Sequence, residues 1–228
     1  MKFKEKLFMD HWQLEKEGPI NIVVFGDSIT HGCVETDIFD YDTVYWNRLR
    51  KKIMEVRNYV PINIINAGLE GTTAKYSLSR LETQVLSHHP DVIIICFGLN
   101  DVNGTLEEYL ESLKLIFDKC KKSGAEIVFM TPNMLNTYVA KDVLEQHKEY
   151  AAVTADYQNG GKMDLFMSSA VALAETMQIS VCDCYCKWKE LSREQDITLC
   201  LANRINHPTR EMHELFAESL FETLFKDL

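Results

Sequence analysis

The 228-residue sequence lacks any segment close to the roughly 20 consecutive apolar residues that a membrane-spanning helix needs. Its first residues, MKFKEKLFMDHWQLEKEGP, include lysines but lack the apolar run of a signal peptide. Internal repeats, low-complexity tracts and recognisable linkers are also missing. These absences predict a cytoplasmic protein without a membrane span, in which residues 1–228 form a single domain.

Basic residues are scarce relative to acidic ones. The chain has 24 Lys and Arg against 34 Asp and Glu, a formal net charge of −10 and a pI near 5.2. An acidic surface argues against nucleic acids and anionic membranes as partners, because both attract basic patches. Hydrophobic residues make up 46% of the chain, which is enough for a sizeable core.

The seven cysteines are odd in number, and several lie inside apolar runs. Buried free thiols in a reducing compartment are the simplest interpretation. Cys182, Cys184 and Cys186 have a spacing that structural zinc sites rarely use, so core packing is favoured and no metal is predicted. The segment around GDSITHG also lacks the lysine-containing pattern of a phosphate-binding loop.

Five short apolar runs rich in β-branched residues divide the chain: 20–25, 62–66, 91–97, 125–130 and 179–183. Helical patterns lie between and after them, at 43–57, 72–89, 105–124, 161–177 and 207–225. Thr105 is a plausible N-cap with Glu108 as its capping-box partner, Gly124 a stop, and Pro208 suits a first helical turn. This alternation predicts a doubly wound parallel sheet with its active site at the carboxyl ends of the strands.

Chemically useful residues follow these runs. Gly26-Asp27-Ser28 comes after the first, Gly68 after the second, Gly98-Leu99-Asn100-Asp101 after the third, and His207-Pro208 after the fifth. A nucleophile, hydrogen-bond donors and a base would therefore meet at one edge of the sheet. The same residues taken singly are ordinary turn formers, caps or surface groups, and only their combination favours catalysis.

GDSIT, the glycine after the second run, GLND and the late HP resemble the four blocks of the SGNH (GDSL) hydrolases, over residues 20 to about 225. The resemblance implies a flavodoxin-like three-layer α/β/α sandwich with five parallel strands, and we expect the order 2-1-3-4-5. It also implies that Ser28 is the nucleophile and His207 the general base. The N–H groups of Ser28 and Gly68 and the amide of Asn100 would form the oxyanion hole.

Neighbouring residues have less certain roles. Asp27 either orients the nucleophile loop or is a plain turn former, and Asp101 is expected to anchor its loop. His31 is a spatial rival to His207, although a histidine lining the site is the better interpretation, and His213 is expected to be structural.

The chain departs from the family at Arg204, where most members have the aspartate of D-x-x-H. Arginine cannot accept the imidazole N–H. Asn203, Asn206 or a backbone carbonyl could orient the ring instead. Three interpretations stay open: a Ser–His dyad, a carboxylate from elsewhere such as Asp183 or Asp196, or a weakly active or inactive relative. A dyad or a carbonyl-oriented histidine is favoured.

We expect hydrolysis of a carboxylic ester through an acyl-Ser28 intermediate, without metal or cofactor, and with a short acyl group such as acetyl on a carbohydrate. Two segments are expected to line the cleft: 35–45, and 134–162 with Tyr138, Tyr150 and Tyr157. The alternatives are a non-catalytic protein that binds an acylated or glycan ligand and, more weakly, a flavin-binding module. A homo-oligomer is left open.

Overall fold

A computed structural model describes residues 3–35 and 37–226, which form a five-stranded, wholly parallel sheet. Its strands are β1 (Ile20–Gly26), β4 (Ile62–Gly68), β5 (Val92–Cys96), β6 (Glu126–Met130) and β7 (Ser180–Cys182), in the spatial order β4-β1-β5-β6-β7. Counted among these five strands alone, this is the predicted order 2-1-3-4-5. The five apolar runs are confirmed as strands. Side chains are buried on both faces in the central strands, as in β5, whereas the edge strands β4 and β7 are partly exposed.

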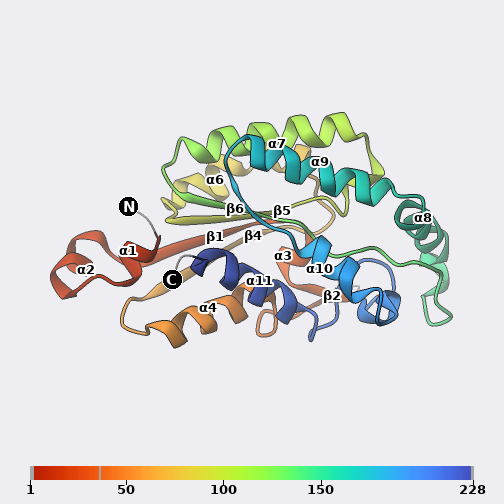
Figure 1. Ribbon diagram of the computed structural model, residues 1–228, viewed down its shortest axis with the longest axis horizontal. Coiled ribbons are helices and arrows are strands. Elements are labelled where there is room, and N and C mark those ends of the chain that lie inside the picture. Colours follow the sequence, from red (N-terminus) through yellow and green to blue (C-terminus); the bar gives the residue numbers. More distant parts are fainter. Residues whose placement is uncertain (1–2, 36, 227–228) are drawn as a thin grey trace.

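Helices cover both faces of the sheet. In Figure 1, α6, α7 and α9 lie over one face and α4 and α11 over the other, which confirms the three-layer α/β/α sandwich. The helices are α1 (Phe3–Leu7), α2 (His11–Glu17), α3 (Ser28–His31), α4 (Tyr45–Val56), α5 (Ala74–Ser77), α6 (Leu81–Gln84), α7 (Leu106–Lys121), α8 (Lys148–Asn159), α9 (Lys162–Thr176), α10 (Cys184–Leu191) and α11 (His213–Phe225). Short 3₁₀ turns are η1 (Leu86–His88), η2 (Asp101–Asn103), η3 (Glu145–His147) and η4 (Ile197–Cys200).

A small antiparallel hairpin, β2 (Cys33–Glu35) with β3 (Ile38–Phe39), follows α3 and was not expected from the sequence. It lies at the same end of the molecule as α3, α8 and α10, whereas α1 and α2 lie at the opposite end (Figure 1). The carboxyl ends of the strands point toward α3, so the hairpin stands beside the edge where the sequence places the site.

The prediction for the helix at 105–124 is largely confirmed. The Thr105 hydroxyl accepts a hydrogen bond from the Glu108 N–H at 3.3 Å, as an N-cap does. The Glu108 carboxylate does not complete a capping box, because it pairs with Lys75 at 2.6 Å. The helix ends at Lys121, and Gly124 follows in the turn with a φ of 79°.

Two helix predictions are corrected. The pattern at 72–89 forms α5, α6 and η1 instead of one helix, because the chain turns at Arg80, whose buried side chain reaches back to the strand ends. The last helix starts at His213 and not near Pro208. Leu201 and Pro208 form an isolated antiparallel bridge, with Ala202 N–H donating to the His207 carbonyl at 2.7 Å, so residues 200–209 are a tight loop.

No helix among residues 3–35 and 37–226 is long and apolar enough to cross a membrane. A single domain over residues 1–228 stays a prediction.

Candidate active site

Ser28 is the first residue of α3, directly beyond the carboxyl end of β1. The preceding Asp27 caps this helix, and its carboxylate accepts a hydrogen bond from the Ile29 N–H at 3.1 Å. Gly26 is required by close packing, since a Cβ there would lie 2.2 Å from the Thr30 hydroxyl and 2.6 Å from the Cys96 carbonyl oxygen. The loop therefore presents Ser28 on a rigid turn, and Asp27 orients that turn.

His207 lies within hydrogen-bonding distance of Ser28, although 179 residues separate them. The Nε2 atom of His207 is 3.0 Å from Oγ of Ser28. The serine is only 5% exposed, so reagents reach it through the cavity in front of it. A serine hydroxyl bonded to an imidazole can lose its proton to that ring during attack, which is the activation that a serine nucleophile needs.

The imidazole of His207 has no acidic partner. Its Nδ1 atom is buried, and no described residue forms a hydrogen bond with it. Burial lowers the pKa of His207 to about 4, and the backbone carbonyl of Val34 in β2 opposes that shift. The ring therefore contacts Ser28 and no acid among the described residues, which is the arrangement of a Ser–His dyad, and the dyad stays a prediction.

Asn203 does not orient the ring of His207, and this prediction is corrected. Its Oδ1 atom accepts hydrogen bonds from the N–H groups of Ile205, Asn206 and His207, each at 3.0 Å. The side chain therefore shapes the loop that carries the histidine, and acts on the backbone of His207 instead of its ring.

The other substitutes for the missing acid are also corrected. The Asp183 carboxylate caps α10 and accepts from the Thr131 hydroxyl at 2.9 Å, and Asp196 accepts from the Tyr138 hydroxyl at 2.6 Å. Arg204 has a left-handed backbone with φ of 60°, and its guanidinium pairs with Asp142 at 3.0 Å. Arg204 stands where most of the family has an acid. Its ion pair with Asp142 ties the loop 200–209, which carries His207, to the segment after β6.

A cavity of about 710 Å³ opens in front of Ser28 and His207. Apolar and charged side chains from distant parts of the chain line it. They include Glu35 of β2, Glu70 and Gly71 after β4, Asn100 after β5, Asp142, Val143, Leu144, His147 and Tyr150 after β6, and residues 202–206. The predicted walls at 35–45 and 134–162 thus both contribute, and Tyr150 is the one of the three tyrosines that lines the cavity.

Asn100 lines the cavity and has an amide N–H to spare, so it stays the predicted oxyanion donor. One N–H of its side-chain amide is held by the Thr72 carbonyl at 3.0 Å, and the residue lines the cavity. The second N–H of the amide can then meet developing negative charge. The N–H of Ser28 has no partner inside its own helix because Ser28 is the first residue of α3.

The predicted role of Gly68 is wrong. Its N–H donates to the Asn66 side chain at 2.9 Å and is not free for an oxyanion. Glycine is needed there for another reason, since a Cβ would lie 2.2 Å from the backbone nitrogen of His31. Gly71, with a φ of 68°, lines the cavity beside Asn100 and is the backbone donor that geometry favours. The sequence signal for this donor was the presence of a second glycine, Gly71, three positions after Gly68.

A buried layer supports the loops from behind. Asp101 accepts a hydrogen bond from the Ala74 N–H at 2.9 Å, which confirms that it anchors its loop. The guanidinium of Arg80 donates to the carbonyls of Gly26, at 2.9 Å, and Ala67, and so ties β1 to β4. Burial raises the pKa of both Asp27 and Asp101 to about 7, and for Asp27 the charge of Arg80 acts in the opposite direction.

The rival histidines do not reach the nucleophile. His31 packs against Phe39, with ring centroids 4.5 Å apart and the rings tilted by 48°. His213 is 1% exposed, accepts from the Tyr45 N–H at 3.2 Å and is the first residue of α11, so its predicted structural role is confirmed. Tyr157 lies under the ammonium group of Lys162, 4.2 Å from the ring centroid.

A serine–histidine pair facing a cavity with an amide and a glycine N–H, at the carboxyl edge of a parallel sheet, is the arrangement of serine esterases. The chain belongs to the GDSL-like lipase/acylhydrolase family, whose model matches residues 24–215. The resemblance to this family found in the sequence is therefore confirmed.

Individual relatives are more distant. The uncharacterized lipoprotein YqeF of Bacillus subtilis is 26% identical over 157 residues, which cover 65% of this chain and 63% of that protein. Axe2, an acetylxylan esterase from Geobacillus stearothermophilus, superposes with a TM-score of 0.69 at 19% identity, over 90% of this chain and 94% of its own. LAE5, an α/β hydrolase from a metagenome of Lake Arreo, Spain, gives 0.68 at 16% identity with the same coverage. Because both identities are below 25%, these two structures establish the fold alone.

Replacing Asn100 with alanine is expected to lower kcat on p-nitrophenyl acetate by about 10²- to 10³-fold with little change in KM, because one oxyanion donor is lost. Steady-state kinetics on purified protein measures the change. The matched control is Asn63→Ala, at an exposed amide that bonds Asn21 at 3.0 Å on the edge strand. A loss below threefold in Asn100→Ala would remove this residue from the oxyanion hole.

The rate should depend on pH through His207. With its pKa lowered to about 4 by burial, the ring stays neutral and able to accept a proton down to about pH 5. We expect kcat/KM to fall about tenfold for each pH unit below 4. An NMR titration of the ring, assigned by comparison with His207→Gln, measures this pKa directly. A value of 6 or above would contradict the desolvated dyad.

Proposed function

We propose that the protein hydrolyses short-chain carboxylic esters, acetyl groups on carbohydrates in particular, through an acyl-Ser28 intermediate. The observation that carries this proposal is the 3.0 Å contact between Oγ of Ser28 and Nε2 of His207 at the floor of the cavity. The acetyl-carbohydrate part draws on Axe2, which is an acetylxylan esterase of the same fold.

In the first half of the reaction, Oγ of Ser28 attacks the ester carbonyl carbon while its proton passes to Nε2 of His207. The carbonyl oxygen becomes an oxyanion, which the N–H groups of Ser28 and Gly71 and the amide of Asn100 stabilise. The intermediate collapses when the carbon–oxygen bond to the alcohol breaks. The alcohol takes the proton from Nε2, and an acyl-serine remains.

In the second half, water replaces the alcohol. His207 removes a proton from the water as its oxygen attacks the acyl carbon, and the same donors hold the second oxyanion. The bond to Oγ then breaks, Ser28 recovers its proton from Nε2, and the carboxylic acid leaves. Both halves need His207 neutral at the start, as its lowered pKa ensures at neutral pH.

The preference for a short acyl group rests on the mixed cavity wall. Carboxylates of Glu35, Glu70 and Asp142 line the same cavity as Val143, Leu144 and Ile205, so charged groups interrupt the apolar lining. A long acyl chain needs a continuous apolar surface to exclude water. Hydroxyl-rich alcohols, in contrast, find acceptors in the carboxylates.

A p-nitrophenyl ester series tests this proposal. The kcat/KM should be highest for acetate or propionate and lower for octanoate and longer esters. Stopped-flow traces should show a burst of p-nitrophenol, because the acyl-enzyme accumulates. Activity that rises steadily with chain length would contradict the short-acyl assignment, while leaving the esterase mechanism in place.

A second candidate is a binding protein with little turnover, which the unpartnered Nδ1 of His207 favours. Loss of the triad acid weakens a serine hydrolase by orders of magnitude, since the imidazolium is no longer stabilised. A fluorophosphonate reagent separates the two candidates, because it labels only an activated serine. Stoichiometric labelling of Ser28 supports the esterase, and its absence supports the binding protein.

We also propose a cytoplasmic location, supported by seven free cysteines, including a Cys182–Cys184 pair whose sulfurs lie 3.6 Å apart without a bond. The Bacillus relative is named a lipoprotein, so the opposite outcome is a membrane-attached protein. Fractionation of the source cells decides between them.

A further inference from the structure

Aromatic side chains gather on the surface beside the cavity, on the β2–β3 hairpin and the segments around it. The ring of His31 lies 4.5 Å from that of Phe39 and 6.4 Å from that of Tyr41, and Tyr41 stacks on Trp46 at 6.4 Å with an interplanar angle of 29°. Tyr41 is 50% exposed. We call His31, Phe39, Tyr41 and Trp46 the aromatic face.

The aromatic face is held rigidly. The Asp40 carboxylate accepts from the N–H groups of Asp42 and Thr43, each at 3.0 Å, and from Arg210 at 2.6 Å. The indole N–H of Trp46 donates to the Thr30 carbonyl at 2.9 Å. A surface that is already ordered loses little conformational entropy when a ligand covers it, which favours binding.

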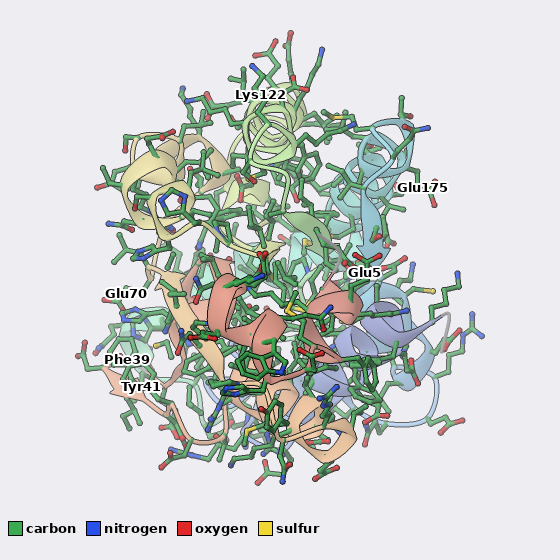
Figure 2. The ribbon with its side chains drawn as sticks, turned by 90° about the vertical axis from the view of Figure 1, so that its left-hand side faces the viewer. Glu5, Phe39, Tyr41, Glu70, Lys122 and Glu175 are labelled. Carbon is green, nitrogen blue, oxygen red and sulfur yellow. The ribbon has the colours of Figure 1, made fainter. Side chains whose placement is uncertain are left out.

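The aromatic face borders the active-site cavity. Phe39 is paired across the hairpin with Cys33, and Glu35 of the same strand lines the cavity. Glu70, also in the cavity lining, is close enough to Cys33 for its charge to raise the pKa of that thiol. Figure 2 shows Glu70, Phe39 and Tyr41 along the same side of the molecule. A ligand longer than the cavity would therefore pass the two carboxylates and reach the rings.

An exposed ring, Tyr41, that is backed by partly buried rings next to carboxylates suits one ligand chemistry better than others. A neutral sugar has an apolar face of C–H groups that packs on an aromatic ring, and hydroxyls that donate to carboxylates. Glu35 and Glu70 have no ion-pair partner among the described residues, so an anionic chain would be repelled. The hairpin that carries Phe39 also supplies Glu35 to the cavity lining, and this continuity points to substrate as the occupant.

We propose that the aromatic face is an accessory subsite that binds the sugar units next to the acetylated one in a neutral oligosaccharide. This inference rests on the proposed function, since it extends the same substrate beyond the cavity. It makes the preferred substrate an acetylated oligosaccharide instead of an acetylated monosaccharide.

Kinetics on acetylated xylose and acetylated xylotetraose test the proposal. The wild-type kcat/KM should be about tenfold higher for the tetrasaccharide, the gain expected from one or two ring contacts. Tyr41→Ala should reduce this ratio to near one, and Tyr41→Trp should keep it because the flat ring is retained. Tyr59→Ala is the matched control, at a tyrosine 48% exposed that contacts Arg57 instead of the aromatic face. A wild-type ratio near one, or a ratio that survives Tyr41→Ala, would overturn the subsite.

Direct binding separates this proposal from the esterase assignment. Xylotetraose and cellotetraose without acetyl groups are titrated into Ser28→Ala protein, and the fluorescence of Trp46 reports binding. We expect saturation at millimolar concentrations, at least tenfold weaker binding to Ser28→Ala/Tyr41→Ala, and weaker binding of a uronic-acid tetramer. No binding, or a change from dimer to monomer in Tyr41→Ala without any effect on sugar, would show that the face has another use, whether or not the protein hydrolyses esters.

Discussion

Ser28→Ala is expected to lower kcat on p-nitrophenyl acetate by about 10⁴- to 10⁶-fold, the cost of removing the nucleophile of a serine hydrolase. The Oγ atom of Ser28 is the one that can form the acyl-enzyme, and the described hydrogen bond of this hydroxyl is the one to His207. Its loss therefore leaves the loop geometry set by Gly26 and Asp27 unchanged. KM should change little, because the cavity lining stays in place.

Ser79→Ala is the matched control for this substitution. The Ser79 hydroxyl is exposed and donates to the Tyr76 carbonyl at 3.1 Å, outside the cavity lining. Its kcat should stay within twofold of wild type. Both proteins should melt within a few degrees of wild type. If Ser28→Ala keeps more than 1% of the wild-type rate and no fluorophosphonate adduct maps to Ser28, the nucleophile is elsewhere and the binding-protein candidate gains support.

The sheet could be predicted because its chemistry is local. A parallel strand covered on both faces is a continuous apolar run, so each of the five runs marks one strand without reference to the others. Ser28, Asn100 and His207 could be predicted for a related reason. Two directly follow strands, and the third has the HP context, so their meeting follows from the topology of a doubly wound sheet.

The features that could not be predicted depend on folded loops. An oxyanion donor made of backbone N–H carries no side-chain signal, and the spacing alone offered both Gly68 and Gly71. The folded loop distinguishes them, because it turns the Gly68 N–H toward Asn66 and places Gly71 in the cavity lining. The Arg204–Asp142 pair joins positions 62 residues apart. The carbonyl of Val34, which affects the pKa of His207, comes from a hairpin with two paired positions, Cys33 with Phe39 and Glu35 with Ile38. Such a hairpin is too short to show a period of its own.

The Arg204–Asp142 pair also bears on why the site lacks an acid. Arg204 donates to Asp142 and to the carbonyls of Leu199, at 3.2 Å, and Leu201, at 2.8 Å. These contacts fix the histidine loop to the cavity wall after β6. In a triad the acid orients the ring from its Nδ1 side, whereas here Asn203 and Arg204 hold only the backbone of the loop that carries His207. His207 is therefore still held beside Ser28, but no acid among the described residues stabilises the positive charge of its ring during the reaction.

The missing stabilisation of the His207 imidazolium also sets the size of the effect expected for replacing His207. His207→Ala is expected to lower kcat on p-nitrophenyl acetate by about 10³- to 10⁴-fold, which is the upper range for a general base. The loss should be smaller than in Ser28→Ala, because a base whose pKa is about 4 accepts the serine proton less readily than one near 7. Fluorophosphonate labelling of Ser28 should slow by a similar factor, since the same proton must leave.

The matched control is His11→Ala, at an exposed histidine in α2 that packs edge-on against Trp12, at the opposite end of the molecule from α8 (Figure 1). Its kcat should equal that of wild type. If His207→Ala retains more than a tenth of the activity while Ser28→Ala has none, the base is another group or a water held in the cavity. The Ser–His contact at 3.0 Å would then position the serine without taking its proton. If both variants lose activity in the expected order, the dyad alone drives acyl transfer, and the absence of an acid explains a modest wild-type rate.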